Sequence, residues 1–283
     1  MRFFPCRLLL IGPALLAVTA LQANAALIAY EGFDYAGGVN LTTETANNGT
    51  GWTAAWATTG VNGLVTSGTG QSLSFSQSPA LITDGSTHVF SNSSKGNERD
   101  FNTTVNLASD TLYFTALVRD FDGGAATGQM RVQFHDGLGA GGNMRANIGI
   151  DAGTLFADGN STGYGVGATL ASAFATDTTY LLAMKRTGAS IFGALIPADG
   201  NPGSLAAEPV WQVQDDLASG VTFRSIRLLT NSNVGTGAGG LRIDELRVAT
   251  DWDSAVNGLV VPEPGSLILL GLGGMSFLFR RRR

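Results

Sequence analysis

The fold is constrained first by a recurring pattern of short apolar segments that turn residues separate. Segments such as 111–120 (TLYFTALVRD) and 130–135 (MRVQFH) are strongly strand-like, and Gly, Asn and Asp stand between such segments. Apolar residues at every second position of a strand share one face of a sheet. No long apolar stripe at the 3.6-residue helical period competes with this pattern. The sequence therefore predicts an all-β domain built as a two-sheet sandwich.

Ten segments are predicted to contain strands. They are 27–33, 63–75, 111–120, 130–135, 147–150, 154–157, 180–186, 190–196, 225–230 and 241–249. Residues 120–128 (DFDGGAATG) have the turn chemistry of a hairpin connection between two of them. Residues 92–97 are polar and are expected to form a loop. Trp52 and Trp56 follow another loop, and we expect them to pack in the core or at its edge, with a sugar-stacking platform as the alternative.

The N-terminal segment has the pattern of a secretory signal peptide. Arg2 and Arg7 precede an apolar run over 8–21, and Ala23 and Ala25 then supply small residues at the positions that a signal peptidase reads. Cleavage is expected after Ala25. The alternative is an N-terminal anchor that is not cleaved.

The C-terminal segment has three parts in a fixed order. Pro262, Glu263 and Pro264 precede an uncharged apolar run over 265–279. Four arginines close the chain: Arg280, Arg281, Arg282 and Arg283. As a helix the apolar run would be about 22 Å long, which is short for a hydrocarbon core of about 30 Å but can be accommodated by local thinning. The arginines are expected to resist translocation and stay on the cytoplasmic side.

The composition between these two ends disfavours several partners. Six of the 17 basic residues and one of the 22 acidic residues lie in the terminal segments, so 11 basic and 21 acidic residues remain over 26–261, a formal charge of −10. Such an acidic surface disfavours DNA, RNA and anionic membranes. Cys6, the single cysteine, lies in the segment that is expected to be removed, so neither disulfide nor thiol chemistry is expected in the domain.

The triplet, apolar run and basic block together resemble a PEP-CTERM sorting signal, the C-terminal tag of exported bacterial proteins. The resemblance implies processing by an exosortase-type enzyme near Pro262–Pro264 after brief anchoring in the inner membrane. The alternative is a plain C-terminal anchor that is never cut. The expected division of the chain is a signal peptide (1–25), a β-sandwich (26–252), a linker (253–260) and a sorting segment (261–283).

Three further phrases carry a looser resemblance. TLYFTALVRD (111–120), YLLAMKR (180–186) and GGLRIDELRVATDW (239–252) resemble laminin-G-like and concanavalin-A-like jelly-roll domains over residues 27–252. The resemblance implies a jelly-roll sandwich with a concave face that often binds glycans, sometimes with calcium at its rim. It does not establish a ligand or an activity, because such folds host many functions.

No catalytic carboxylate pair is assigned. Hydrolases on this fold use the spacing Glu-x-Asp-x-x-Glu on one strand, and the nearest match, Glu98 and Asp100, has Thr103 where the second glutamate should stand. Asp244 and Glu245 are adjacent, so they are expected to face opposite sides of a strand and to form salt bridges. Their expected partners are Arg242 and Arg247.

Two or three aspartates are candidates for a calcium site, although no metal ligand is assigned. Asp120 and Asp122 offer oxygen ligands of the kind that calcium prefers, and Asp136 could join them from a neighbouring strand end. The alternative is that these are solvated turn residues. His88 and His135 are isolated in sequence, so no zinc site is assigned.

The leading hypothesis is a non-enzymatic, exported cell-surface or matrix protein of a bacterium. Its sandwich is expected to bind glycan or to associate with extracellular polysaccharide and biofilm, as the resemblances imply. Two alternatives stay open: a glycan-active hydrolase whose carboxylates are distant in sequence, and a calcium-dependent, lectin-like module. The expected partners are an exosortase-type enzyme, the inner membrane through the C-terminal helix, and extracellular polysaccharide, but no nucleic acid.

Overall fold

The computed structural model describes most of the chain between the two terminal segments, and the structural statements below concern those residues. They are 27–43, 49–58, 64–66, 72–75, 89–90, 95–106, 111–120, 129–139, 142–159, 167–171, 174–175, 177–198, 205–216, 222–230 and 241–257.

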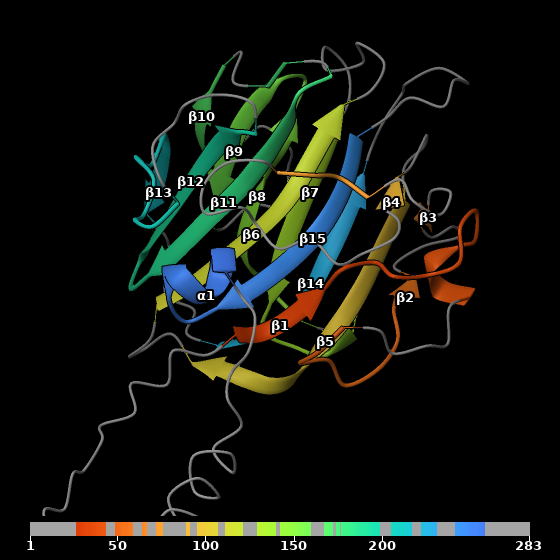
Figure 1. Ribbon diagram of the computed structural model, residues 1–283. Coiled ribbons are helices and arrows are strands. Elements are labelled where there is room, and N and C mark those ends of the chain that lie inside the picture. Colours follow the sequence, from red (N-terminus) through yellow and green to blue (C-terminus); the bar gives the residue numbers. More distant parts are fainter. Residues whose placement is uncertain are drawn as a thin grey trace, which may run out of the picture.

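The described strands form two antiparallel sheets that lie face to face (Figure 1). Sheet A has the order β13 (Val213–Asp216), β12 (Ser190–Pro197), β11 (Thr179–Thr187), β6 (Thr111–Asp120), β15 (Leu241–Ala249), β4 (Val89–Phe90) and β3 (Val65–Thr66), and β1 (Leu27–Glu31) also pairs with β15. Sheet B has the order β10 (Ala168–Leu170), β9 (Thr154–Asp158), β8 (Met144–Asp151), β7 (Gln129–His135), β14 (Thr222–Thr230), β5 (Lys95–Asn106) and β2 (Ala57–Thr58). A short 3-10 helix covers Leu41–Thr43, and α1 covers Trp252–Asn257. The predicted all-β, two-sheet sandwich is confirmed.

The chain crosses repeatedly from one sheet to the other, as in a jelly roll. Strand β6 lies in sheet A and β7 in sheet B, so the predicted hairpin across 120–128 is wrong. Turn residues allow a tight connection but do not require one, and here the apolar faces of both strands are buried between the sheets. Strand β14 likewise lies in sheet B, whereas β15 returns to sheet A.

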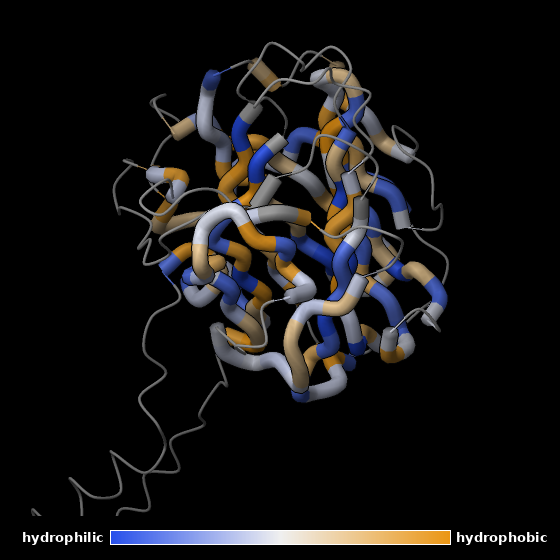
Figure 2. Tube along the Cα trace, turned by 90° about the vertical axis from the view of Figure 1, so that its right-hand side faces the viewer, coloured by the Kyte–Doolittle hydropathy of each residue, from blue (hydrophilic) through white to orange (hydrophobic). Residues whose placement is uncertain are grey.

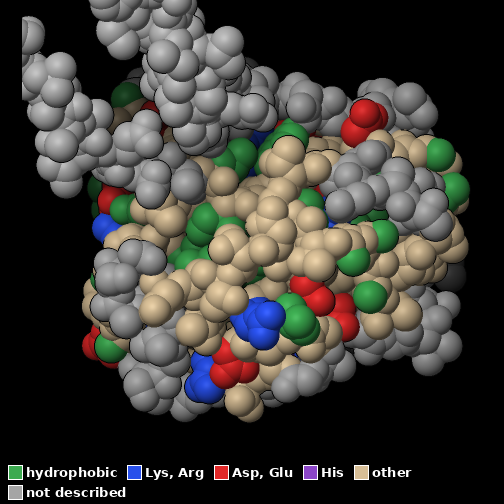
Figure 3. All heavy atoms as spheres, turned by 90° about the horizontal axis from the view of Figure 1, so that it is seen from below, with side chains coloured by type: hydrophobic (Ala, Val, Ile, Leu, Met, Phe, Trp, Pro, Cys, Tyr) green, Lys and Arg blue, Asp and Glu red, His purple; other side chains and the backbone are tan. Residues whose placement is uncertain are grey.

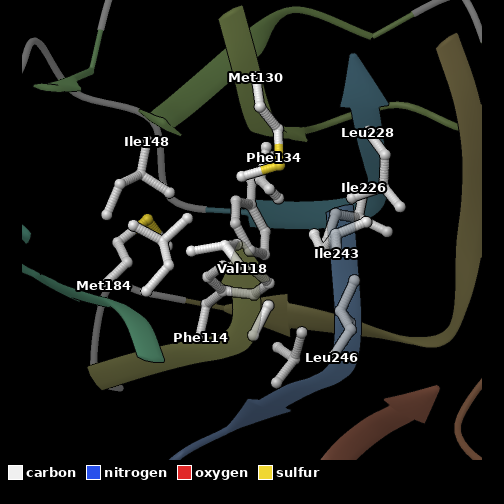
Figure 4. Packing of buried hydrophobic residues seen from close by; sticks show 14 of the residues in the cluster. Phe114, Val118, Met130, Phe134, Ile148, Met184, Ile226, Leu228, Ile243 and Leu246 are labelled. Atoms are coloured by element: carbon white, nitrogen blue, oxygen red, sulfur yellow. The ribbon is translucent and has the colours of Figure 1, made fainter. Parts of the chain in front are cut away.

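The core fills the space between the sheets. Phe114 and Val118 from β6 meet Phe134 from β7, and the rings of Phe114 and Phe134 pack edge to face at 5.6 Å (Figure 4). Orange and blue alternate along the tube in Figure 2, in keeping with the period of two in the strands. The core is therefore built from the alternate residues that the sequence pattern indicates.

Strand β5 is the main element that the sequence pattern misses. The predicted loop over 92–97 overlaps its first residues, because the strand begins at Lys95. Its sequence, KGNERDFNTTVN, is polar. Asn97 and Arg99 nevertheless lie opposite Leu228 and Ile226 of β14, which belong to the core. Cross-strand partners point to the same face, so these polar side chains are directed inward. The sequence of β5 therefore lacks the alternation of apolar and polar residues by which a strand is predicted.

A second group of buried apolar residues covers the outer face of sheet A. This outer cluster consists of Leu73, Phe75, Tyr113, Leu117, Leu181, Ala183, Ile196, Ala198, Leu205, Ala249, Trp252, Ala255 and Val256. Helix α1 supplies three of its members, and it lies in front of β6 and β15 in Figure 1. The folded domain thus extends to Asn257, whereas the sequence places the start of the linker at Asp253.

Candidate functional site

A row of polar side chains crosses the outer face of sheet B. Glu98 of β5, Arg227 of β14, Gln133 of β7, Asn147 of β8 and Asp158 of β9 are successive partners in the strand register. In β14, β7 and β8 the residues on either side of each row member belong to the core. Alternation therefore directs the row away from the core. We call these five residues the polar row.

Arg227 holds one end of the polar row in place. Arg227 Nε lies 2.8 Å from Glu98 Oε2, and Arg227 Nη2 donates to the Gly139 carbonyl at 2.9 Å. Gln133, Asn147, Asp158 and Glu98 are all at most 7% exposed. Amide, carboxylate and guanidinium groups together both donate and accept hydrogen bonds, which suits a ligand rich in hydroxyl groups.

Partly exposed polar residues border the row. Gln129 Nε2 donates to Asp151 Oδ1 at 2.7 Å, and these two residues lie opposite each other across β7 and β8. Arg131 occupies the position between Gln129 and Gln133 on the same face. Gln129, Arg131 and Asp151 are partly exposed, although Nε and Nη1 of Arg131 are buried, whereas four of the five row members are nearly buried.

His135 lies on the same face, two residues beyond Gln133. Its Nδ1 is 3.1 Å from the Gly142 carbonyl, and its Nε2 is 3.4 Å from the Gln133 side-chain amide. Burial lowers the pKa of His135, and the nearby charge of Arg227 lowers it further, against the raising effect of the Gly142 bond. The imidazole is therefore neutral at pH 7. In the neutral ring, Nδ1–H donates to the Gly142 carbonyl, and Nε2 carries no proton toward Gln133 Oε1, which is itself an acceptor.

The two carboxylates that match a hydrolase strand are committed to structural bonds. Glu98 and Asp100 both point to the outer face of sheet B, as alternation predicts. Glu98 is ion-paired with Arg227, and Asp100 Oδ1 accepts a hydrogen bond from the Gly139 backbone N–H at 3.0 Å.

Of the calcium candidates, Asp120 and Asp136 belong to different sheets. Asp120 is the last residue of β6 in sheet A, and Asp122 lies outside the described residues. Asp136 follows β7 in sheet B, where its carboxylate lies 2.6 Å from Arg145 Nη2 and accepts the Asn143 N–H at 2.7 Å. Within the described part of the chain, no three His, Cys, Asp or Glu side chains gather as a metal ion would require.

Trp52 and Trp56 pack in the core, as the leading interpretation predicts. They are 5% and 3% exposed, with ring centroids 6.0 Å apart. Arg99 lies over both rings, at 4.9 Å from Trp52 and 5.6 Å from Trp56. A sugar-stacking platform needs an exposed ring face, so the alternative role is wrong.

Asp244 and Glu245 both make structural bonds. Glu245 has a φ of 53° in an irregularity of β15, and its carboxylate pairs with Arg247 at 3.0 Å and accepts from Tyr30 Oη at 2.9 Å. Asp244 accepts instead from Ser72 Oγ and the Leu73 N–H, at 2.6 and 2.7 Å.

The irregularity also overturns the expected alternation of these two carboxylates. Asp244 lies opposite Leu117 of the outer cluster. The two partners of the Glu245 carboxylate, Arg247 and Tyr30, lie opposite each other in β15 and β1. Both carboxylates are therefore engaged on the outer side of sheet A. Burial raises the pKa of Asp244, and the charge of Glu245 raises it further.

Charged side chains of both signs are interspersed on the face of the molecule that Figure 3 shows. Acidic and basic groups lie next to each other there, and tan and green groups cover most of that face.

The terminal candidates all lie outside the described residues. These are the cleavage residues Ala23 and Ala25, the triplet Pro262, Glu263 and Pro264, and the arginines Arg280, Arg281, Arg282 and Arg283. Among the residues that the structure describes, no helix has the length and hydropathy needed to span a bilayer. The sequence of residues 260–283 matches the family model for the PEP-CTERM protein-sorting motif. The chain ends in a PEP-CTERM sorting motif. The motif marks an exported protein that is sorted to the cell envelope.

Several solved structures resemble the sandwich. The Ca²⁺-bound VIP36 exoplasmic/lumenal domain aligns at 10% identity and a TM-score of 0.44, over 75% of this chain and 89% of that chain. Lectin II from Ulex europaeus aligns at 8% and 0.41, over 60% and 88%. Alginate lyase AlgAT5 from Polysaccharide Lyase family 7 aligns at 10% and 0.36, over 65% and 74%. No curated protein sequence matches this chain significantly. At this level of similarity, nothing about ligand or activity follows for this chain.

The polar row is the part of the site that the sequence interpretation misses. Its members come from five strands, and Glu98 and Arg227 are 129 positions apart. The available signal is local: Gln129, Arg131, Gln133 and His135 put a polar side chain at every second position of β7. That pattern shows a polar outer face, but it cannot show which strands lie beside it.

Proposed function

We propose that this protein is exported by a bacterium, is processed by an exosortase at its PEP-CTERM motif, and binds extracellular glycan on the outer face of sheet B. The observation that carries the glycan-binding assignment is the polar row with its border of Gln129, Arg131 and Asp151. Gln129, Arg131 and Asp151 are the partly exposed groups that can meet sugar hydroxyls. They stand on ordered strands beside the nearly buried row, so binding does not require the site to reorder, which lowers its cost.

The net charge of the domain favours a neutral glycan over an anionic one. Residues 26–261 carry a formal charge of −10, and on this face Glu98, Asp151 and Asp158 outnumber Arg131 and Arg227. An anionic polysaccharide would be repelled at long range. The role in the envelope is thus attachment to, or organisation of, neutral exopolysaccharide in the matrix.

The proposed activity is binding without catalysis. Arg227 holds Glu98, and the Gly139 backbone N–H holds Asp100. The carboxylates of Asp244 and Glu245 are buried on sheet A. Retaining and inverting hydrolases need two carboxyl groups that reach the scissile bond, about 5–9.5 Å apart. Incubation with a neutral polysaccharide panel is expected to release no reducing ends, and release would favour the hydrolase alternative.

A glycan array followed by calorimetry on the selected neutral oligosaccharide tests the binding site. Arg131→Ala is expected to weaken binding about tenfold or more, because a hydrogen bond from a charged group contributes about 1.5–3 kcal/mol. Arg119→Ala is the matched control, since Arg119 is a partly exposed arginine on sheet A. Equal affinities of both variants and the unchanged protein would contradict the assignment. Binding that chelator abolishes would favour the calcium-dependent module instead.

Processing is tested by the intact mass of the protein from the native host. We expect a species that begins at Ala26 and ends near Pro262–Pro264. Replacing Glu263 with alanine should leave export intact but block the C-terminal cut. A Glu263→Ala variant of normal mature mass would contradict processing at this motif.

A further inference from the structure

The first strand of the domain begins beside the end of its last strand. Strand β1 begins at Leu27, which pairs with Ala249 at the end of β15. Three residues after Ala249 the chain enters α1, and Leu27 packs against the outer cluster to which α1 belongs. Figure 1 shows α1 on the near side of sheet A, of which β1 is a strand, with β7 and β8 behind that sheet. Asn257, the last residue that the structure describes, therefore lies on the outer side of sheet A.

Helix α1 is firmly docked there despite its length of six residues. Ala255 and Val256 are fully buried, and Trp252 Nε1 donates to the Leu205 carbonyl at 2.8 Å. Thr115 Oγ1 of β6 donates to the Ala255 carbonyl at 2.5 Å. Isolated helices this short are not stable in water, so these tertiary contacts hold it.

The docking limits how far the sorting motif can stand from the domain. Only four residues, 258–261, separate Asn257 from Pro262. Five Cα–Cα steps span at most about 17 Å when fully extended. A folded domain of about 230 residues has a radius of gyration of about 17 Å. The motif therefore cannot move away from the domain by more than about the radius of the domain.

We propose that α1 sets the reach of the sorting motif and orients the domain at the membrane. While the tail is anchored, the outer face of sheet A faces the lipid surface, and the polar row on sheet B points away from it toward extracellular glycan. If α1 were undocked, the free chain would begin near Asp251 and the reach would increase by about 20 Å. This inference rests on the sorting step of the proposed function.

Changes in linker length test the reach. Deleting residues 258–260 leaves two Cα–Cα steps, about 7 Å, between Asn257 and Pro262. We expect the cleaved fraction, measured by intact mass, to fall at least tenfold. Adding Ala255→Asp to the deletion places a charge in a fully buried position and should undock α1, which is expected to restore at least half of the cleavage.

Two controls keep this experiment decisive. Thr103→Asp adds the same charge at an exposed position of β5 and should not rescue the deletion. Replacing 252–257 by a Gly-Ser segment of equal length undocks the chain without burying a charge, so rescue by this variant supports the proposal if Ala255→Asp impairs folding. Normal cleavage of the deletion, or no rescue by either undocked variant, would overturn it. Absence of cleavage in the unchanged protein would instead refute the sorting step itself.

Orientation is tested separately on the uncut Glu263→Ala protein in vesicles that contain a nitroxide-labelled lipid. The domain has no cysteine of its own, so single fluorophores can be attached at Asp253→Cys in α1 and at Asn102→Cys on sheet B, both exposed positions. We expect at least twofold stronger quenching at position 253 than at position 102. Equal or reversed quenching would overturn the proposed orientation.

Discussion

Glu31 and Arg99 form an ion pair that is fully buried between the sheets. Glu31 also accepts hydrogen bonds from Trp56 Nε1 at 3.0 Å, Tyr35 Oη at 2.9 Å and the Phe33 N–H at 2.9 Å. Burial raises the pKa of Glu31, whereas the charge of Arg99 and these three donors lower it. Arg99 and the three donors therefore offset the cost of burying the Glu31 charge. Removal of Arg99 should lower the stability of the folded domain.

Arg99→Met is expected to lower the free energy of unfolding by about 3–5 kcal/mol, because it leaves the Glu31 carboxylate buried without its cation. Urea denaturation at pH 7 measures the change. Arg119→Met is the control, since Arg119 forms a partly exposed pair with Asp177 at 3.7 Å and such pairs contribute at most about 1 kcal/mol. A loss of less than about 1 kcal/mol for Arg99→Met would show that the pair is not needed for stability.

The lowered pKa of His135 predicts a loss of stability in mild acid. Between its folded-state pKa and the ordinary value of about 6.5, the unfolded chain binds one more proton at this site than the folded protein does. The free energy of unfolding should therefore fall as the pH drops below about 6.5, by up to about 1.4 kcal/mol per pH unit.

Urea denaturation at several pH values measures this dependence for the unchanged protein and for His135→Gln. The variant keeps a donor and an acceptor but has no proton to gain, so its stability should vary less between pH 7 and pH 5. Parallel pH profiles for the two proteins would contradict the assignment of the slope to His135.

Two elements depend on backbone conformations that their residue types do not predict. Ala152 and Gly153 connect β8 and β9 in a two-residue turn with φ values of 48° and 77°, the left-handed conformation that Asn-Gly prefers. In β15, the register with β6 shifts between Asp244 and Arg247, and Glu245 with its positive φ lies at this shift. Alanine and glutamate are not residues from which such conformations would be predicted.

Ala152→Asn should stabilise the domain by about 0.5–1 kcal/mol, because asparagine tolerates a positive φ better than alanine does. The midpoint of thermal unfolding is expected to rise. Ala152→Val serves as the opposite control, since a β-branched residue is strained in this conformation and should lower the midpoint. A midpoint that falls in both variants would mean that the turn is held by contacts to Ala152 itself.

At the level of elements, the apolar strands could be predicted and the polar ones could not. Strands β6, β11 and β12 show clear apolar faces, and each is found close to its predicted bounds. Strand β5 is missed because Asn97 and Arg99 occupy inward positions, where partners from distant segments satisfy them: Asn97 Oδ1 accepts the Leu64 N–H at 2.6 Å, and Arg99 pairs with Glu31. Local periodicity carries no information about such partners.

At the scale of the whole molecule, the proposed function depends on a tail that anchors the domain until it is cut. The basic block is the part that should hold the tail in place, because arginines next to an apolar run resist translocation. Deleting Arg280–Arg283 is expected to shift the protein from the membrane fraction to the periplasm or medium before normal processing. Replacing the four arginines by lysines keeps the charge and is the matched control. A deletion variant that stays in the membrane and is processed normally would contradict the stop-transfer role.

The sequence by itself determined the all-β class, the two-sheet arrangement and the sorting motif. Each of these depends on a local property: alternation along a strand, or the order of a short triplet, an apolar run and a basic block. Only the tertiary structure decided that β6 and β7 part into different sheets, that Glu98, Arg227 and Gln133 meet in one row, and that α1 folds back onto sheet A. Those outcomes depend on which distant segments bury each other's apolar faces and satisfy each other's polar groups, and that choice is made by the whole chain at once.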